Sequence, residues 1–377
     1  MNISPIDLSV FVLYCVLILF VGLYVSRKKE GHVEDANDYF LAGRGLAWWA
    51  IGASIIASNI SAEQFVGMSG SGYAIGLAMA TYEWIAAKWF LPIFLKRGIF
   101  TMPQFLEERF DKRVKTVMAF FWLIVFVFVN LTSILYLGAL TIQSVMGIPL
   151  LYGVIGLALF AVVYSINGGL KAVALTDVIQ VFFLVGGGLI TTYIALDLLG
   201  AGEGVLKGCE TLYLKTEDKF HLILDPSHPG YMDLPGLSVI LGGLWVANLY
   251  YWGCNQYIIQ RALAAKNIKE AQWGMAFAGV IKLLIPLLVV IPGIAAFALD
   301  APLSKPDEAY PWLLGNLLPV GVKGIAFAAL TAAIVSSLAS MMNSISTIFT
   351  MDIYQVYIRP EGDASHLVRV GKMTSLV

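Results

Sequence analysis

The chain has 377 residues, of which 59% are hydrophobic and only 13% are charged. A soluble domain carries about 25% charged residues, so this chain has too little charge to cover a water-facing surface. The 24 basic and 25 acidic residues nearly balance, which gives no indication of a nucleic-acid partner, and three scattered cysteines provide no disulfide framework. The composition therefore predicts a membrane protein.

Uncharged stretches of about 20 residues, the length of a helix that crosses the hydrocarbon core, recur along the chain. The first, Leu8 to Ser26, follows no basic segment and precedes no small-residue cleavage site, so we interpret it as a retained span and not as a signal peptide. We expect an all-helical protein with nine spans, at 6–26, 44–71, 73–96, 116–145, 149–167, 172–199, 235–261, 270–299 and 319–356.

The distribution of Lys and Arg predicts how these spans are oriented. Seventeen of the 24 basic residues fall in segments on the side of the C-terminal tail, and four fall on the opposite side. Because basic residues collect on the cytoplasmic side of a membrane, we expect the tail in the cytoplasm and the N-terminus outside. The protein would then be a multi-pass component of the plasma or inner membrane.

The longest predicted external loop divides the spans into two groups. We expect an extra span and a cytoplasmic loop at 1–43, a first repeat of five spans at 44–199, an extracellular or periplasmic loop at 200–234, and three spans of a second repeat at 235–377. Five is an odd number, so the second repeat runs inverted, as in many secondary transporters. Because it is two spans shorter than the first repeat, we expect the sequence to be incomplete at its C-terminal end.

Polar residues interrupt the second and the seventh span at about the same place. The second contains the run from Ala57 to Gln64, and the seventh the run from Ala247 to Gln256. An unpaired amide in lipid costs several kcal/mol, so a loosened helix survives only where it lines a cavity or meets a ligand. Such a pair indicates a central binding site; close packing between helices is the alternative explanation.

Ionisable residues inside the spans are a second signal, because each costs about 2.5–3.5 kcal/mol at the bilayer centre. Glu83 and Lys282 come from different spans and can serve the same polar ligand. Asp177 either caps the sixth span or lies on an ion path.

A third signal is the run Ala333-Ile334-Val335-Ser336-Ser337 in the ninth span. Residues 333, 336 and 337 share one helix face, as do Ala57 and Ile60 in the second span. Two hydroxyls and the carbonyls freed by a broken helix make an oxygen cage for a monovalent cation. Serines that bond to their own helix backbone are the alternative. Phosphate-binding glycine loops and zinc-ligand spacings are absent from the sequence, so we expect no enzyme and no cofactor.

Four runs of residues resemble the sodium:solute symporter family. They are Asn59 to Phe65, Gly168 to Gln180, Gly243 to Arg261 and Ala333 to Ser340, and the similarity extends over nearly the whole chain. The closest resemblance is to the bacterial sodium/galactose branch, which is related to the animal sodium/glucose cotransporters. The resemblance implies an inverted-repeat transporter bundle with discontinuous helices, of the LeuT-like class. It also implies import of a hexose, galactose or glucose, coupled to sodium by alternating access.

The resemblance also implies roles for individual residues. The family's sugar-hydroxyl ligands match Gln64, Glu83, Asn248 and Lys282. Tyr251 matches an aromatic that stacks on the sugar and closes its inner exit, with Asn59 as hydrogen-bond partner, and Trp252 is a second candidate for the flat apolar surface. Sodium ligands match the carbonyls of Ala57, Ile60 and Ala333 and the hydroxyls of Ser336 and Ser337. Asp177 matches an acidic residue on the sodium exit path.

Three features depart from the family. Ala86 stands where the family has a serine, and the third span is about two helical turns short, which brings Lys88 near the bilayer middle. A glutamine expected on the last span, another sugar ligand, is missing. The alternatives are a symporter for inositol, sialic acid or an amino acid, a sodium- and sugar-binding sensor, or a fragment that does not transport. The sequence does not indicate an oligomeric state.

Overall fold

The computed structural model describes residues 4–27, 34–61, 68–69, 71, 86–221, 223–228, 231–232 and 242–376. These residues form helices and their connections, and the extended pairing among them is one isolated β-bridge between Leu46 and Ala265. The predicted all-helical class is thereby confirmed.

Five helical stretches in the described residues are long and apolar enough to cross a membrane. They match five predicted spans, and a shorter apolar stretch, Leu150–Val163, lies within another predicted span, 149–167. The five are Pro5–Val25 (α1), Lys112–Met146 (α7, Lys112–Ile124, and α8, Thr132–Met146), Gly168–Leu199 in α9 (Leu150–Leu199), Ile268–Ala298 (α14, Ile268–Lys282, and α15, Ile291–Ala298) and Val322–Ile358 (α17, Val322–Ile348, and η9, Phe349–Ile358).

Helix α9 contains the fifth and sixth predicted spans and reverses direction between them. The reversal falls at Gly169, whose backbone has φ 51° and ψ −152°. A Cβ atom at this position would lie 2.3 Å from the carbonyl oxygen of Tyr39. Glycine therefore meets two requirements here, a left-handed φ and a close backbone approach.

Both predicted interruptions are found. Helix α3 (Trp48–Asn59) ends inside the predicted second span, with non-helical backbone at Ile60. The seventh span is divided into α12 (Leu244–Gly253) and α13 (Gln256–Leu263), with extended backbone at Asn255 between them.

The other helical segments are short and connect or extend the spans. They are α2 (Ala36–Leu41), η1 (Ala42–Arg44), η3 (Ala86–Phe90), α5 (Leu91–Arg97), α6 (Met102–Arg109), η4 (Val125–Leu131), α10 (Val205–Lys215), η5 (Glu217–Phe220), η7 (Pro286–Val290), η8 (Pro306–Glu308), α16 (Ala309–Asn316) and α18 (Ala364–Thr374).

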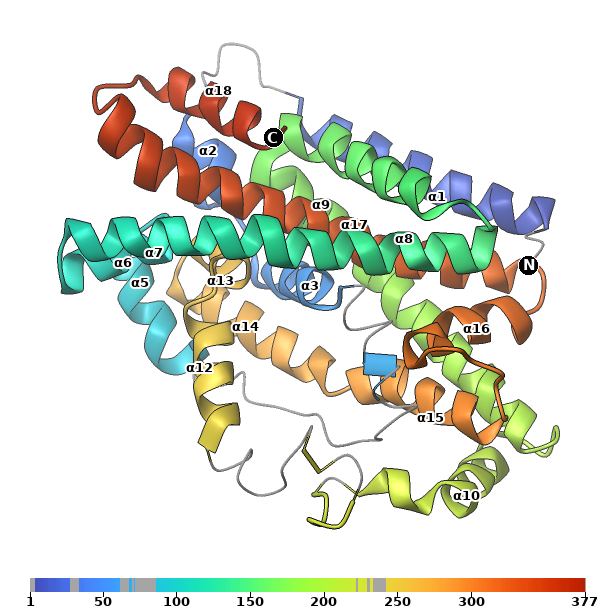
Figure 1. The fold of residues 1–377 in the computed structure, drawn as a ribbon. Coiled ribbons are helices and arrows are strands. Elements are labelled where there is room, and N and C mark those ends of the chain that lie inside the picture. The colour runs from blue at the N-terminus through green and yellow to red at the C-terminus, as the bar shows by residue number, and fades with distance from the viewer. Residues whose placement is uncertain are drawn as a thin grey trace.

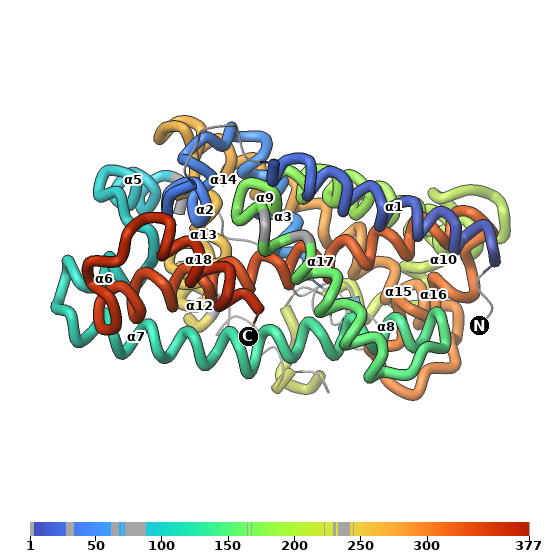
Figure 2. The backbone as a smooth tube through the Cα atoms, turned by 90° about the horizontal axis from the view of Figure 1, so that it is seen from above, coloured from blue at the N-terminus to red at the C-terminus, as the bar shows by residue number. Residues whose placement is uncertain are grey.

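Helix α17 lies at the centre of the bundle and packs along α9, α1 and α3 (Figures 1 and 2). Nearly all of its side chains are buried, whereas α1 exposes large apolar residues such as Leu13 and Phe20, at 70% and 63% exposure. Apolar side chains exposed along a helix of this length are expected where the helix faces lipid.

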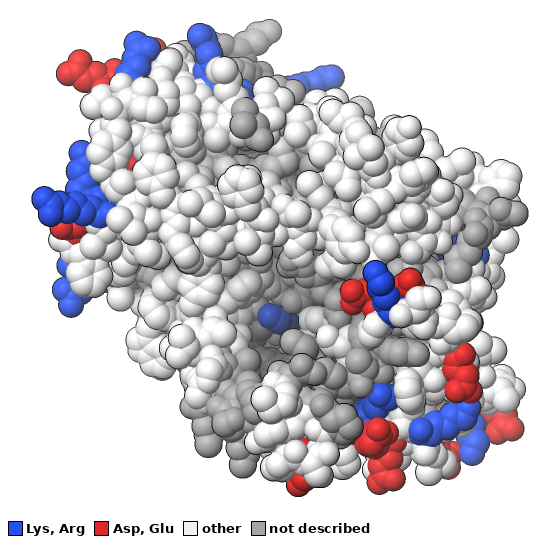
Figure 3. Space-filling view, in the orientation of Figure 1, with Lys and Arg blue, Asp and Glu red and all other residues white. Residues whose placement is uncertain are grey.

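Connections predicted on one side of the membrane gather at one end of the molecule. Helices α2 and α18 lie at the upper left of Figure 1 and α6 at its left edge, whereas α10, α16 and the N-terminus lie at the right. In the same orientation, most Lys, Arg, Asp and Glu side chains on this face collect along the top and left edge and at the lower right, and the surface between them is mostly uncharged (Figure 3). This is the surface of a protein that spans a membrane.

Candidate functional site

A cavity of about 480 Å³ lies where the end of α3 faces α12, α13 and the middle of the stretch from α7 to α8. Its volume is in the range of small-molecule sites. It is lined by Asn59, Ser61, Trp122, Val125, Asn130, Ala247, Asn248, Tyr250, Tyr251, Asn255, Tyr257 and Lys282. Four of the predicted site residues, Asn59, Asn248, Tyr251 and Lys282, are therefore brought together in one cavity.

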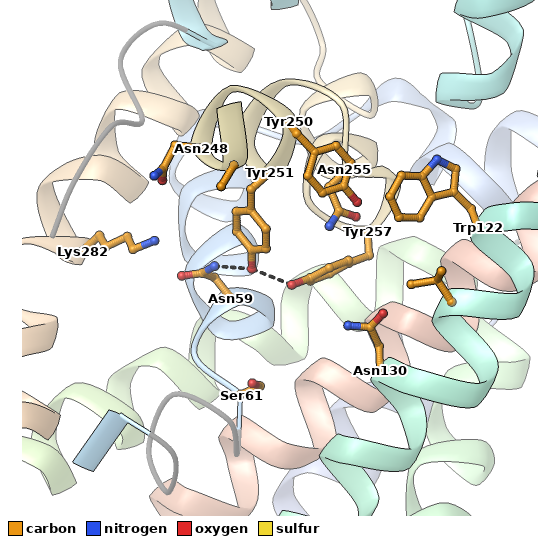
Figure 4. A pocket seen from close by; sticks show the side chains of 12 residues that line it. Asn59, Ser61, Trp122, Asn130, Asn248, Tyr250, Tyr251, Asn255, Tyr257 and Lys282 are labelled. Atoms are coloured by element: carbon orange, nitrogen blue, oxygen red, sulfur yellow. Dashed lines mark hydrogen bonds between the residues drawn. The ribbon is translucent and has the colours of Figure 1, made fainter. Parts of the chain in front are cut away.

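Three polar side chains form a hydrogen-bonded chain across this cavity (Figure 4). The amide nitrogen Nδ2 of Asn59 donates to the hydroxyl of Tyr251 over 2.5 Å, and that hydroxyl also lies 2.5 Å from the hydroxyl of Tyr257. Asn59 ends α3, Tyr251 lies on α12 and Tyr257 lies on α13. These hydrogen bonds thus join the end of α3 to both α12 and α13, the two helices on either side of the break in the seventh span. Tyr257 was not predicted from the sequence.

The cavity also presents hydrogen-bond acceptors. The side-chain oxygens Oδ1 of Asn59 and Asn255 are buried, and neither has a hydrogen-bond partner in the described part of the chain. A buried polar atom that stays unpaired costs about 1–3 kcal/mol. Both oxygens are therefore ready to accept hydrogen bonds from a ligand.

Lys282 and the two aromatic residues predicted for stacking lie together. Figure 4 shows Lys282 and Asn248 on one side of the Tyr251 ring and Tyr257, Asn255 and Trp122 on the other. The Lys282 ammonium is 4.5 Å from the ring centre of Trp252 and 5.8 Å from that of Tyr251, within cation–π range.

Trp252 itself is only 1% exposed and does not line the cavity. It packs edge-on against Tyr251, with ring centres 5.6 Å apart. Tyr251 is thus the aromatic of this pair that faces the cavity. The other two predicted sugar ligands, Gln64 and Glu83, lie outside the described residues.

The wall opposite α12 was missed by the sequence analysis. The ring of Trp122 stacks on that of Tyr250, with the ring centres 5.0 Å apart and an angle of 6° between the ring planes. Asn130 lies in the π-helical turn Val125–Leu131, whose other residues are all apolar. In the sequence, the available signal was a lone asparagine inside an apolar run of a span. In the structure, the π-turn is a second indication, because such turns are frequent at functional sites.

The candidate sodium ligands lie where α3 ends beside α17. The amide of Ser61, the usual helical partner of the Ala57 carbonyl, instead donates to the carbonyl of Asn59 over 3.0 Å. The hydroxyl of Ser337 donates to the carbonyl of Ser58 over 2.9 Å, which joins the two helices. The five predicted ligands are all buried: Ala57, Ile60, Ala333, Ser336 and Ser337. Their coordination of sodium stays a prediction.

Asp177 lies in a polar network between four helices. Its carboxylate accepts hydrogen bonds from the hydroxyls of Ser54 and Ser336, the latter over 2.6 Å. The guanidinium of Arg261, on α13, lies 3.9 Å from it and donates to Ser54 and Ser340. Asp177 is well inside its helix, which resumes after Gly169, so the capping alternative is wrong. Its place on an ion path stays a prediction, and the partner role of Arg261 was not foreseen.

A protein-family model, the sodium:solute symporter family, matches residues 39–377. The chain is 55% identical over 400 residues to a sodium/glucose cotransporter of Vibrio parahaemolyticus, and the match covers all of this chain and 74% of that protein. It is 36% identical to sodium/glucose cotransporter 4 of Danio rerio, covering 98% of this chain and 61% of that protein. It is 34% identical to sodium/myo-inositol cotransporter 2 of Sus scrofa, and the match covers 100% of this chain and 60% of that protein.

The same architecture is found in a solved structure, a substrate-bound, outward-open Na⁺-coupled sialic acid symporter. The TM-score is 0.86 at 24% sequence identity, and the match covers 99% of this chain and 78% of the other. This likeness shows the fold, and the chain spans about 60% of the length of the two animal relatives named above. The chain belongs to the sodium:solute symporter family, which consists of membrane transporters and not of enzymes.

Proposed function

We propose that this protein is a sodium-coupled secondary active symporter that imports a hexose, galactose or glucose, by alternating access. The proposal extends the family assignment to a substrate and a coupling ion. Within the family, we place the chain beside the bacterial sodium/galactose symporters, and the 55% identity to the sodium/glucose cotransporter of Vibrio parahaemolyticus supports this choice.

The observation that carries the proposal is the end of α3, where two consecutive residues contact two different sites. The carbonyl of Ser58 accepts a hydrogen bond from the hydroxyl of Ser337, a candidate sodium ligand on α17, and the hydroxyl of Ser58 lies 3.0 Å from that of Ser340. The next residue, Asn59, bonds to Tyr251 in the cavity. A shift of this helix end on sodium binding would therefore move a side chain that faces the sugar. Such a shared element supplies coupling, because both ligands bias the same conformational equilibrium.

The chemistry of the cavity suits a neutral polyol. Sugar hydroxyls need paired donors and acceptors and a flat apolar surface for the ring. The cavity offers the ammonium of Lys282, the unpaired oxygens of Asn59 and Asn255, and the ring of Tyr251. In energetic terms, one sodium ion that falls through 100 mV releases about 2.3 kcal/mol, which supports roughly 50-fold accumulation of a sugar.

The test is uptake by the purified full chain in sealed vesicles. With an inward sodium gradient, we expect labelled galactose or glucose to accumulate above its external concentration, and a sodium ionophore to abolish the accumulation. Equal uptake in sodium-free buffer would disprove the coupling. Sodium-dependent sugar binding or currents without accumulation would identify a sensor instead.

Inositol is the second candidate substrate, because a sodium/myo-inositol cotransporter is among the relatives at 34% identity. Inositol offers a ring of hydroxyls to the same donors and acceptors. Competition against labelled galactose by unlabelled glucose, galactose and inositol ranks the three. An inhibition constant for inositol well below those of both hexoses would reassign the substrate.

We also infer that the N-terminus lies outside the cell and the C-terminal segment in the cytoplasm, in a plasma or inner membrane. The bias of the basic residues supports this orientation. We further infer that 44–199 and 235–377 are inverted repeats, because an interrupted helix occupies the corresponding place in each. Labelling of single introduced cysteines from either side of the membrane tests the orientation of the termini and the inverted arrangement of the repeats.

A further inference from the structure

A second cavity, of about 530 Å³, shares no lining residue with the cavity at the end of α3, which we call the sugar cavity because of its proposed ligand. It is found where η1, the end of α5 and the start of α14, with the residues just before it, meet. It is lined by Arg44, Leu95, Ala265, Lys266, Asn267, Ile268 and Lys269. We call it the basic pocket, because three of these seven side chains are cationic.

The three cations of the basic pocket have no acidic partner among the described residues. Arg44 donates from Nη2 to the carbonyl of Gly98 over 2.8 Å, which leaves most of its guanidinium donors available. Lys266 and Lys269 are exposed, and no ion pair joins either to a described residue. Glu270, the acidic residue that follows Lys269 in the sequence, accepts a hydrogen bond from the amide of Trp48 over 2.6 Å and forms no ion pair with a described residue of the pocket.

The backbone holds these cations in place. Leu46 and Ala265 form the isolated β-bridge, in which the Leu46 amide donates to Ala264 and the Lys266 amide donates to Leu46, both over 3.1 Å. Arg44 has a left-handed backbone, with φ 49°. Side-chain-bearing residues adopt this conformation at a cost, and they keep it where the surroundings impose it, often at binding sites. The pocket is thus built by tertiary structure and is not a loose cluster of surface lysines.

Exposed tryptophans indicate the depth of the basic pocket in the membrane. Trp48 and Trp49 begin α3, directly after the β-bridge, and are 41% and 45% exposed. Trp273, at 67% exposure, is four residues after Lys269 and lies on the same face of α14. Exposed tryptophans concentrate at the level of the lipid headgroups. The cations therefore lie at the height of the lipid phosphates.

We propose that the basic pocket binds the phosphate of an anionic phospholipid, held by Arg44, Lys266 and Lys269. Arginine's planar guanidinium fork matches phosphate oxygens, and two ammonium groups balance the remaining charge. Leu95 and Ile268 supply an apolar wall for the start of the lipid chains. Basic pockets between membrane helices are a recurrent form of lipid headgroup site.

The test compares two double variants of the full chain that remove the same charge. Lys266→Gln with Lys269→Gln empties the pocket of two exposed cations, and Arg113→Gln with Lys171→Gln removes two exposed cations elsewhere. Binding of phosphatidylglycerol to the detergent-solubilised protein is titrated by native mass spectrometry. We expect about 30-fold weaker binding for the pocket variant, from about 1 kcal/mol per basic residue, and no change for the control. Equal weakening in both variants, or in neither, would overturn the proposal.

A parallel arm distinguishes a lipid from a free anion. Inorganic phosphate is added to the native protein and to the pocket variant, and the thermal unfolding midpoint is followed. We expect phosphate to have the same small effect on both. Stabilisation by phosphate that the pocket variant loses would assign the pocket to a soluble anion and disprove the lipid assignment. Neither arm depends on transport, so failure here leaves the proposed sugar symport untouched.

Discussion

The guanidinium of Arg261 and the carboxylate of Asp177 lie 3.9 Å apart, and both side chains are completely buried. Arg261 comes from α13 and Asp177 from α9, and the hydroxyl of Ser54 on α3 bridges them. The same carboxylate accepts from Ser336, a predicted sodium ligand on α17. One ionic pair thus connects four helices at the candidate ion site.

Arg261→Gln is expected to destabilise the protein strongly. Removal of one partner leaves a buried charge uncompensated, which costs about 3–5 kcal/mol. Addition of Asp177→Asn removes that charge, so the double variant should recover part of the loss. The measurement is the thermal unfolding midpoint of the protein in detergent, with Arg113→Gln, at an exposed position, as the control. Equal midpoints for the single and the double variant would contradict an ionic interaction.

Tyr251→Phe should open the inner exit of the sugar cavity. It removes the hydroxyl that joins Asn59 to Tyr257, and a hydrogen bond of about 0.5–1.5 kcal/mol corresponds to a roughly 2- to 10-fold change in the open population. We expect sugar efflux from preloaded vesicles to accelerate by about that factor. Tyr250→Phe is the matched control, because Tyr250 contacts Trp122 through its ring. Equal acceleration by both variants would remove the gating role.

Ser336→Ala should weaken the dependence of uptake on sodium more than it weakens sugar affinity, because the change deletes a predicted sodium ligand. Asn248→Ala, in the sugar cavity, should do the reverse. Initial rates of uptake, measured over a matrix of sodium and sugar concentrations, separate the two effects. Parallel changes in both constants for both variants would count against the assignment of two sites.

Gly169→Ala should destabilise the protein by about 2 kcal/mol or more, because alanine must adopt a φ of 51° while its Cβ meets the Tyr39 carbonyl at 2.3 Å. Gly156→Ala, in the same helix, adds a Cβ with nothing within 4 Å and should leave stability unchanged or slightly raised. Thermal unfolding of both variants provides the comparison. A Gly169→Ala protein as stable as Gly156→Ala would show that the reversal does not require glycine.

The sequence by itself determined where most spans lie and where two of them break. The predicted spans 6–26 and 319–356 correspond to Pro5–Val25 and Val322–Ile358, and the second break falls at Asn255. Because lipid offers the backbone no hydrogen-bond partner, an apolar stretch long enough to span the membrane must be helical. A polar interruption survives there only where it lines a cavity or meets a ligand. The family motifs then located four of the cavity's side chains.

Only the tertiary structure decided which side chains meet. It paired Asp177 with Arg261, placed Trp252 behind Tyr251, added Tyr257 to the hydrogen-bonded chain, and gathered Arg44 with Lys266 and Lys269. Periodicity along a helix indicates which face a residue occupies but not which helix lies opposite that face. The Asp177–Arg261 pair and the basic pocket join residues far apart in the sequence, and these contacts depend on how the helices cross, which local patterns do not encode.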